Sequence, residues 1–251
     1  MDYAPRRRTT GYMKILIIAT SHEQLGDTGR KTGLWLEELA NPYYIFKDGG
    51  ADITLASPKG GPIPLDPKSE SIIASTSTIR RFQKDLEAIA LIEHSISLDT
   101  ILKAEDFDML FITGGHGPMW DFPDNPLLQQ LTEDFSRQQK VIGAVCHGVA
   151  ALLSPKAEFG IALVKGRQLT AFSNTEEQAS GLTEVVPFLL ESNLVAAGAL
   201  YSKSADYTSH TVTDGNLITG QNPASAKEVA RKMLVLWKEL SGKAISLAQL
   251  N

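Results

Sequence analysis

The segment VIGAVCHGVAALLS at residues 141–154 constrains the fold most, because it predicts a buried strand, a tight turn and then a helix. A strand that passes through Cys146, His147 and Gly148 into an Ala/Leu stretch is typical of a nucleophile elbow. Such a turn holds a side chain at the amino end of a helix, where unpaired N–H groups favour a negative charge. We therefore predict that the Cys146 thiol ionises easily and that the amides of Cys146 and His147 can hold an oxyanion. The alternative is a structural cysteine in a core strand.

Three further apolar runs predict parallel strands that are buried on both faces, at residues 13–20, 51–57 and 107–113. Amphipathic stretches predict helices at 32–41, continuing through 43–47 with a stop or kink before Pro42, at 126–138, and at 226–240. Asn222 is the expected N-cap of the last helix, with Pro223 in its first turn. This alternation predicts an α/β fold with a mostly parallel sheet and ligands at the carboxyl ends of its strands.

The remaining segments are less regular. Residues 58–67 are too rich in Pro and Gly for a helix or a central strand, and they begin a small insertion around 58–105. Residues 70–95 are expected to be mainly helical, with inward-facing Leu86, Ile89, Ala90 and Leu91. We also expect a helix start at 173–178, a strand near 194–197, and a hairpin within 211–219 that turns at Asp214-Gly215.

Glu38 is expected to face the protein interior. At about 100° per residue it falls between Leu34 and Trp35 on the apolar stripe, whereas Glu37 points to the opposite side. An inward carboxylate can be a structural ion pair or a cap on a neighbouring loop. It can also be a general acid or base whose pKa is raised by apolar surroundings.

The strand at 107–113 runs directly into Gly114-Gly115-His116-Gly117-Pro118, where glycines let backbone amides approach a ligand closely. We predict that Gly115 is a second oxyanion donor and that Gly114 and His116 belong to the substrate site. The alternative is a simple Gly-rich turn between a strand and a helix. Because ligands bind at the carboxyl edge of such sheets, we expect Glu38, Gly115 and Cys146 to meet there.

Composition and charge exclude several functional classes. The formal net charge of -5 argues against a nucleic-acid partner, and no apolar stretch approaches the roughly 20 residues of a membrane span. The single cysteine cannot form an internal disulfide, so we expect a reducing, cytoplasmic setting. Residues 1–12 are expected to be a disordered extension, which leaves 13–251 as a single domain. The sequence has no phosphate loop, Cys-pair zinc motif or dinucleotide fingerprint, and we expect neither a cofactor nor a metal.

Five segments stand in a fixed order along the chain: TG at 32–33 with Glu38, SPKGG at 57–61 with LDP at 65–67, GGHG at 114–117, AVCHG at 144–148, and TGQNPAS at 219–225. Together they resemble the DJ-1/PfpI superfamily, in particular its heat-shock-protein-31-like branch. The resemblance covers nearly the whole chain after residue 12. It implies a flavodoxin-like sandwich, related to class I glutamine amidotransferases, that forms a homodimer.

The same resemblance assigns roles to individual residues. It implies a nucleophile at Cys146, its partner histidine at His147, and a proton-transferring acid at Glu38. It also implies an acid beside the histidine, which aligns with Glu177, with Glu176 as the alternative.

The activity that this resemblance implies is a glyoxalase III-like lyase reaction. Methylglyoxal, a small 2-oxoaldehyde, would be converted to D-lactate without glutathione or any cofactor, through a hemithioacetal on Cys146 and proton transfer by Glu38. Deglycase and holdase activities are also implied for relatives. Two other hypotheses are a chaperone or oxidation sensor in which Cys146 becomes a sulfinic acid, and an amidase or peptidase. A glutamine amidotransferase is not expected, because no downstream His-x-Glu pair is present.

Overall fold

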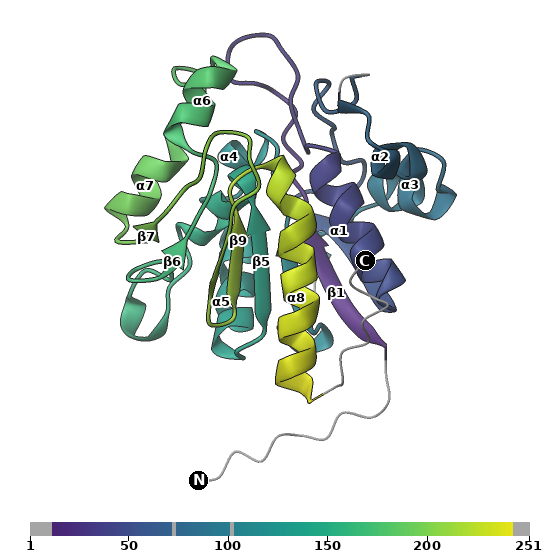
Figure 1. The fold of residues 1–251 in the computed structure, drawn as a ribbon, viewed down its shortest axis with the longest axis vertical. Coiled ribbons are helices and arrows are strands. Elements are labelled where there is room, and N and C mark those ends of the chain that lie inside the picture. The colour runs from purple at the N-terminus through teal and green to yellow at the C-terminus, as the bar shows by residue number, and fades with distance from the viewer. Residues whose placement is uncertain (1–11, 72–73, 101–102, 243–251) are drawn as a thin grey trace.

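The computed structural model of the protein describes residues 12–71, 74–100 and 103–242 (Figure 1). A seven-stranded sheet runs through it in the order β3-β2-β1-β4-β5-β9-β8, parallel throughout except where β8 pairs with β9. Its strands are β1 (Met13–Ile18), β2 (Ala51–Ser57), β3 (Ile96–Ser97), β4 (Met109–Ile112), β5 (Val141–Val145), β8 (Thr211–Asp214) and β9 (Leu217–Gly220). A small parallel pair joins β6 (Gln168–Leu169) to β7 (Leu200–Tyr201). The predicted, mostly parallel sheet is confirmed, whereas the predicted extension lies, except for Tyr12, outside the described residues.

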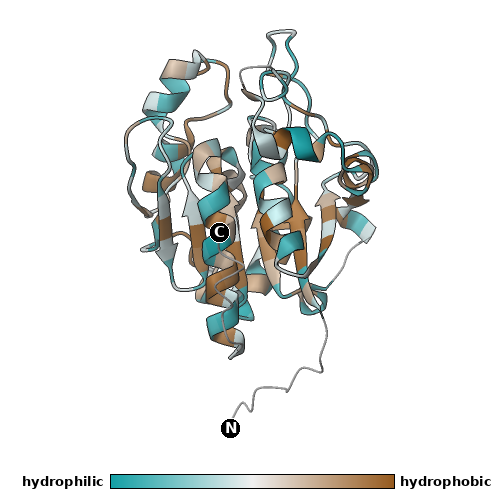
Figure 2. Cartoon of the chain, turned by 45° about the vertical axis from the view of Figure 1, so that its right-hand side comes forward, coloured by the Kyte–Doolittle hydropathy of each residue, from teal (hydrophilic) through white to brown (hydrophobic). Residues whose placement is uncertain are grey.

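The central strands are apolar on both faces, as expected of parallel strands that are covered on both sides. In β1, Ile15 and Ile17 pack into one core while Leu16 and Ile18 pack into the other, and all four are fully buried. Figure 2 shows the apolar strands enclosed between helices whose outer faces are more polar. Two cores therefore hold the sheet rigidly in the middle of the molecule.

The helices form the two outer layers. One core is closed by α1 (Glu37–Asp48), α2 (Ser77–Phe82), α3 (Leu86–Glu93) and α8 (Ala226–Ser241). The other core is closed by α4 (Pro118–Asp121), α5 (Pro126–Arg137), α7 (Leu190–Ala196) and the 3-10 helix η4 (Cys146–Leu152). Helix α6 (Asn174–Ser180) lies near the carboxyl ends of the strands (Figure 1), and the short 3-10 turns are η2 (Leu98–Thr100), η3 (Ala104–Asp106), η5 (Glu158–Gly160) and η6 (Pro223–Ser225). Among the described residues no helix has the length and apolar character needed to cross a bilayer.

The helix predicted from residue 32 begins only at Glu37, and it continues through Pro42 to Asp48. The preceding residues are held in an extended loop, because Leu34 pairs with Leu65 and its N–H donates to the Pro64 carbonyl over 2.8 Å. A Cβ on Gly33 would lie 2.1 Å from that same carbonyl oxygen, so this close approach requires glycine. Contact with a distant loop thus overrides the local helical pattern.

Two other predictions were wrong. The segment at 194–197 is not a strand, because Leu190 and Leu194 are spaced by one helical turn and form the buried side of α7. Among the described residues of 70–95 only two short helices form, and Leu86 is 81% exposed, while Ala88 is the buried residue of α3. Ala90 is also exposed, and Ile89 and Leu91 are half-buried, so the stripe predicted for this insertion is rotated.

Candidate active site

Cys146 lies at the turn between β5 and η4, as the elbow pattern predicts. Its φ of 56° is left-handed, a conformation that costs a non-glycine residue about 1–2 kcal/mol. The turn is tight because η4 packs on the end of β4, where a Cβ on Gly148 would lie 2.4 Å from the Thr113 carbonyl oxygen. The backbone therefore presents the cysteine side chain at the carboxyl edge of the sheet, beside a cavity of about 730 Å³.

His147 connects the thiol to a carboxylate. Its Nδ1 lies 3.4 Å from Cys146 Sγ, and its Nε2 lies 2.6 Å from Glu177 Oε2. The carboxylate can only accept, so the ring proton belongs on Nε2, which leaves Nδ1 to accept from the thiol. Burial and the neighbouring His116 lower the pKa of His147, so the ring is a neutral base near pH 7.

Glu177 serves two histidines at once. Its other oxygen, Oε1, accepts from His116 Nε2 over 2.8 Å, and the two imidazole rings stand 4.2 Å apart between centroids. Burial alone would raise the pKa of Glu177, but the electrostatic attraction between its carboxylate and His147 and the hydrogen bonds from His116 and His147 hold that pKa well below its usual range. Glu177 is therefore the anion that fixes the position and the tautomer of His147.

Glu176 is the acid that the sequence left as the alternative, and the structure places it elsewhere. Its carboxylate accepts from the Ser173 and Tyr207 amides and from Asn222 Nδ2, at 2.8–2.9 Å. It therefore caps α6 and ties that helix to the loop before η6. Of the two neighbouring acids, only Glu177 contacts His147.

Glu38 projects from the first turn of α1 and is fully buried, so its predicted inward orientation is confirmed. Its Oε2 accepts from the Gly114 amide over 2.8 Å, while Oε1 is buried without a hydrogen-bond partner among the described residues. Burial raises the pKa of Glu38 well above its ordinary value, although the Cys146 thiol and the Gly114 amide oppose this rise. The site therefore contains a carboxyl group next to the sulfur that readily carries a proton.

The thiol does not match the prediction of easy ionisation. Cys146 is 3% exposed, and burial together with the neighbouring Glu38 raises the pKa of the thiol well above its ordinary value. The His147 backbone N–H acts in the opposite direction but is outweighed. The amino end of η4 favours the thiolate, but this does not compensate for the loss of hydration that burial imposes. The thiol therefore needs a base when it reacts.

The backbone amides of the Gly-rich loop at residues 114–117 have different roles. The Gly114 N–H donates to Glu38, so Gly114 positions the acid. It does not line the cavity, contrary to the prediction that it belongs to the substrate site. Gly115 and His116 both line the cavity, and the Gly115 N–H donates to no acceptor in the described part of the chain. A Cβ on Gly115 would lie 2.1 Å from the Gly33 carbonyl oxygen, so the loop closes against the residues before α1.

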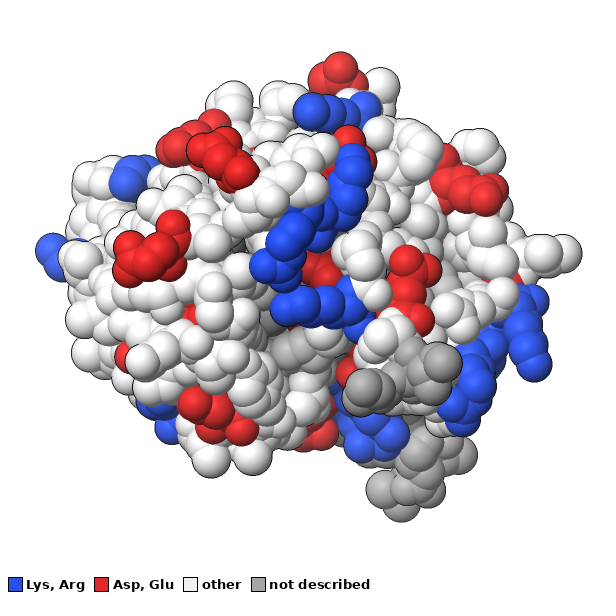
Figure 3. All heavy atoms as spheres, turned by 90° about the horizontal axis from the view of Figure 1, so that it is seen from above, with Lys and Arg blue, Asp and Glu red and all other residues white. Residues whose placement is uncertain are grey.

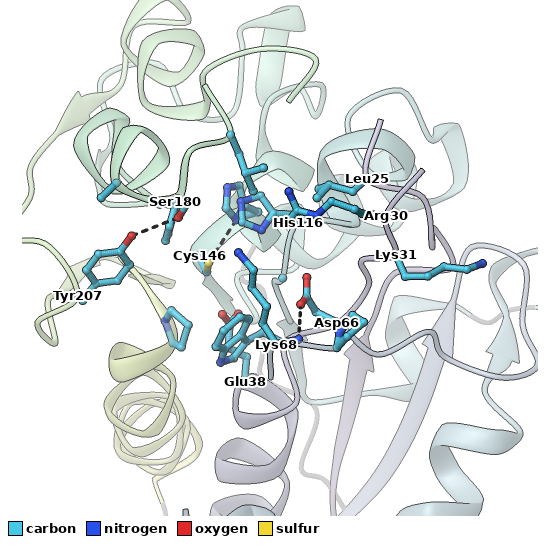
Figure 4. A pocket seen from close by; sticks show the side chains of 18 residues that line it. Leu25, Arg30, Lys31, Glu38, Asp66, Lys68, His116, Cys146, Ser180 and Tyr207 are labelled. Carbon is cyan, nitrogen blue, oxygen red and sulfur yellow. Dashed lines mark hydrogen bonds between the residues drawn. The ribbon is translucent and has the colours of Figure 1, made fainter. Parts of the chain in front are cut away.

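Several cavity residues were not found from the sequence (Figure 4). The Phe172 ring lies 4.4 Å from that of His147 and shields it from solvent. Trp35 and Tyr207 supply apolar wall, and Arg30 and Lys68 supply positive charge at the rim. Phe172 lies only five residues before Glu177, and this short separation could have indicated that it belongs to the site. Arg30 and Lys68 lie in loops whose sequence shows no pattern that would predict their position.

His116, His147 and Glu177 also have the geometry to bind a cation. One potential ligand atom from each lies within 4.8 Å of the others, and histidine with carboxylate is a common zinc ligand set. The same atoms already satisfy one another by hydrogen bonds, so a metal would have to displace the contacts that orient His147.

Comparisons with known proteins identify the family of the chain. The model of the DJ-1/PfpI family matches residues 32–236. Glyoxalase 3 of Candida albicans is 30% identical over 240 residues, which covers 90% of this chain and 99% of that protein. A glutathione-independent glyoxalase of Saccharomyces cerevisiae is 27% identical over 230 residues, covering 86% and 94%. The X-ray structure of Rapid Encystment Protein 24 KDa of Francisella tularensis is 39% identical, covers 90% of this chain and 99% of that one, and has a TM-score of 0.86. The chain belongs to the DJ-1/PfpI family.

Proposed function

We propose that the protein is a cysteine-dependent, glutathione-independent glyoxalase that converts methylglyoxal to D-lactate. The observation that carries this proposal is the buried Glu38 carboxyl beside Cys146, with one oxygen unpartnered among the described residues and a raised pKa. An amidase needs a nucleophile and its base, whereas an internal redox rearrangement also needs a group that moves a proton between two adjacent carbons. The names of the relatives from Candida and Saccharomyces support the same reaction.

The reaction begins with addition of Cys146 Sγ to the aldehyde carbon of methylglyoxal. The thiol proton passes to His147 Nδ1 and then to the former aldehyde oxygen, giving a hemithioacetal. In this proposal the Gly115 N–H, which lines the cavity and has no acceptor among the described residues, stabilises the transient oxyanion. Glu177 compensates the positive charge on His147 while that ring carries the extra proton.

Glu38 performs the next step in its ionised form. It removes the hydrogen of the hemithioacetal carbon as a proton, and the electron pair forms an enediolate with the neighbouring carbonyl. The hydroxyl proton moves from the first oxygen to the second, and Glu38 then protonates the second carbon. The product is a lactoyl thioester on Cys146, and water releases D-lactate and the thiol. A buried carboxyl with a raised pKa is a stronger base than an exposed one, which suits this transfer.

The test is D-lactate formation from methylglyoxal by purified variants. Cys146→Ala and Glu38→Gln are expected to abolish the activity while the circular dichroism spectrum stays that of the wild type. Glu37→Gln is the matched control, because Glu37 precedes Glu38 on the same helix and its carboxylate faces Asn41. Full activity in Cys146→Ala or Glu38→Gln removes the mechanism, and ammonia release from amides without lactate formation would indicate an amidase.

We further propose a homodimer in the cytoplasm that acts on small molecules and not on nucleic acid. The net charge of -5 disfavours nucleic acid, and one cysteine kept as a thiol suits a reducing compartment. Light scattering is expected to give twice the chain mass of 27.3 kDa, and cell fractionation to give a cytosolic protein. A monomer at micromolar concentration contradicts the assembly.

A further inference from the structure

The cavity above Cys146 is larger than methylglyoxal requires. Its volume of about 730 Å³ falls within the roughly 300–1,000 Å³ of pockets that hold drug-sized ligands, whereas methylglyoxal is a three-carbon molecule. The cavity is lined by three segments that are distant in sequence, the loops around residues 25–31 and 66–68 and the end of α6 with the residues after it, 179–182. The space beyond the aldehyde position is therefore available to a longer substrate.

The rim of this space is positively charged. Figure 3 shows Lys and Arg side chains in a row across the upper face of the molecule, and Figure 4 shows Arg30 and Lys68 among the side chains that line the cavity together with Cys146. Neither Arg30 nor Lys68 has a side-chain hydrogen bond or ion pair among the described residues, whereas Lys31 pairs with Glu23 at 2.8 Å. Two cations at the rim thus remain available to an anion.

The carboxylates that line the cavity do not neutralise them. Asp66 accepts from Thr32 Oγ1 and from the Lys68 amide, each over 2.9 Å, and is not paired with the Lys68 ammonium group. Glu38 is held by the Gly114 amide below the sulfur. The rim therefore keeps its positive charge in a chain whose net charge is negative.

The two loops that carry Arg30 and Lys68 are also joined to each other by hydrogen bonds. The Thr32–Asp66 hydrogen bond is buried and ties the loop that carries Arg30 to the loop that carries Lys68. Two backbone hydrogen bonds of 2.8 Å, from Leu34 N–H to the Pro64 carbonyl and from Asp66 N–H to the Leu34 carbonyl, reinforce the connection. The backbones that carry the two cations are thus held next to each other before any ligand binds, while both side chains stay exposed and free to reach it.

We propose that the pocket selects 2-oxoaldehydes that carry a carboxylate at the end remote from the aldehyde, with Arg30 and Lys68 binding that carboxylate while Cys146 takes the aldehyde. This inference rests on the proposed glyoxalase reaction and names its substrate class. Arg30 offers a planar pair of donors that fits a carboxylate, and Lys68 adds a point charge. For 4,5-dioxopentanoate, addition of one water and the internal proton transfer give 2-hydroxyglutarate, and the remote carboxylate is unchanged.

The experiment compares kcat/KM for 4,5-dioxopentanoate with that for its methyl ester, which has the same skeleton without the charge. The wild type is expected to prefer the acid about tenfold. Arg30→Gln and Lys68→Gln should each lower this ratio about two- to fivefold, and the double variant should bring it near one. Lys84→Gln, an exposed lysine in the turn between α2 and α3, changes the net charge equally and should leave the ratio unchanged. The preference should also weaken as salt is added.

A wild type without preference for the acid, or a double variant that keeps it, overturns the proposal. Calorimetry with Cys146→Ala separates this failure from failure of the proposed reaction, because binding is measured without turnover. Tighter binding of the acid than of the ester, lost in the Arg30/Lys68 double variant, supports the anion site even if no hydroxy acid forms. Equal binding of both compounds refutes it even if methylglyoxal is turned over.

Discussion

Gly114→Ala tests whether Glu38 and Cys146 depend on a backbone that passes directly between them. A Cβ at this position would lie 2.5 Å from Glu38 Oε2, 2.8 Å from the Val145 carbonyl oxygen and 2.9 Å from Cys146 Cβ. Contacts become ordinary only at 3.4 Å, so the carboxyl group must move by about 0.9 Å. The Gly114 N–H would also lose its alignment with Glu38, since the same displacement affects that 2.8 Å hydrogen bond.

The expected result is a large decrease in the rate of D-lactate formation together with a moderate decrease in the free energy of unfolding. Misplacement of a catalytic group by about 1 Å costs on the order of 10²-fold in rate, and a forced methyl group in a packed interior costs about 1–3 kcal/mol. D-Lactate formation from methylglyoxal gives the first quantity, and urea unfolding gives the second. The loss should appear in kcat more than in KM, because Glu38 acts after the aldehyde has been captured.

Gly166→Ala is the matched control for this variant. Gly166 has a φ of +73° and no heavy atom within 4 Å of its would-be Cβ, so alanine strains the backbone by about 1–2 kcal/mol without a clash. It should lose similar stability and keep the wild-type rate. Wild-type activity and stability in Gly114→Ala would refute the reasoning, because they would mean that a methyl group fits between Glu38 and Cys146 despite the short distances.

Four other outcomes are expected. Glu177→Gln should lower kcat at least about 100-fold, because His147 loses its orienting anion. The lowered pKa of Glu177 means that its ionised form stabilises the fold above about pH 4.5 and that this contribution is lost as the pH falls, so urea unfolding should show the gap between wild type and Glu177→Gln narrowing in acid. The acid limb of the kcat/KM profile should lie above the ordinary glutamate pKa of 4.5, because burial raises the pKa of Glu38 and its ionised form is the base; a limb at or below that value contradicts the assignment. Zn²⁺ should inhibit reversibly by engaging His116, His147 and Glu177, and His116→Gln should relieve the inhibition; equal inhibition of that variant would place the metal elsewhere.

The inward orientation of Glu38 was predicted correctly from the sequence, whereas the start of the helix that carries it was not. Glu38 was placed inside from its spacing to Leu34 and Trp35, yet neither residue is helical. The orientation is right because Pro42 and Phe46, one and two turns later, lie on the same buried stripe of α1. A stripe extends over several turns, so its direction survives an error in where the helix begins.

Other features depend on contacts that no local pattern encodes. The high thiol pKa follows from burial and from the neighbouring Glu38, whereas a strand-turn-helix pattern indicates only that the thiol lies at the amino end of a helix. Arg30 and Lys68 are brought together by the Thr32–Asp66 hydrogen bond across 34 positions of sequence. Pairing between loops so far apart depends on the assembled sheet, which is why the substrate site was the least predictable part.

Strand β5 is hydrogen-bonded on both sides, to β4 and to β9, so Cys146 directly follows a strand that lies inside the sheet. The two residues proposed to select among aldehydes, Arg30 and Lys68, lie instead in loops outside the sheet. An engineer could therefore exchange those loops to retune which carbonyl compounds are admitted, and the sulfur would keep its place.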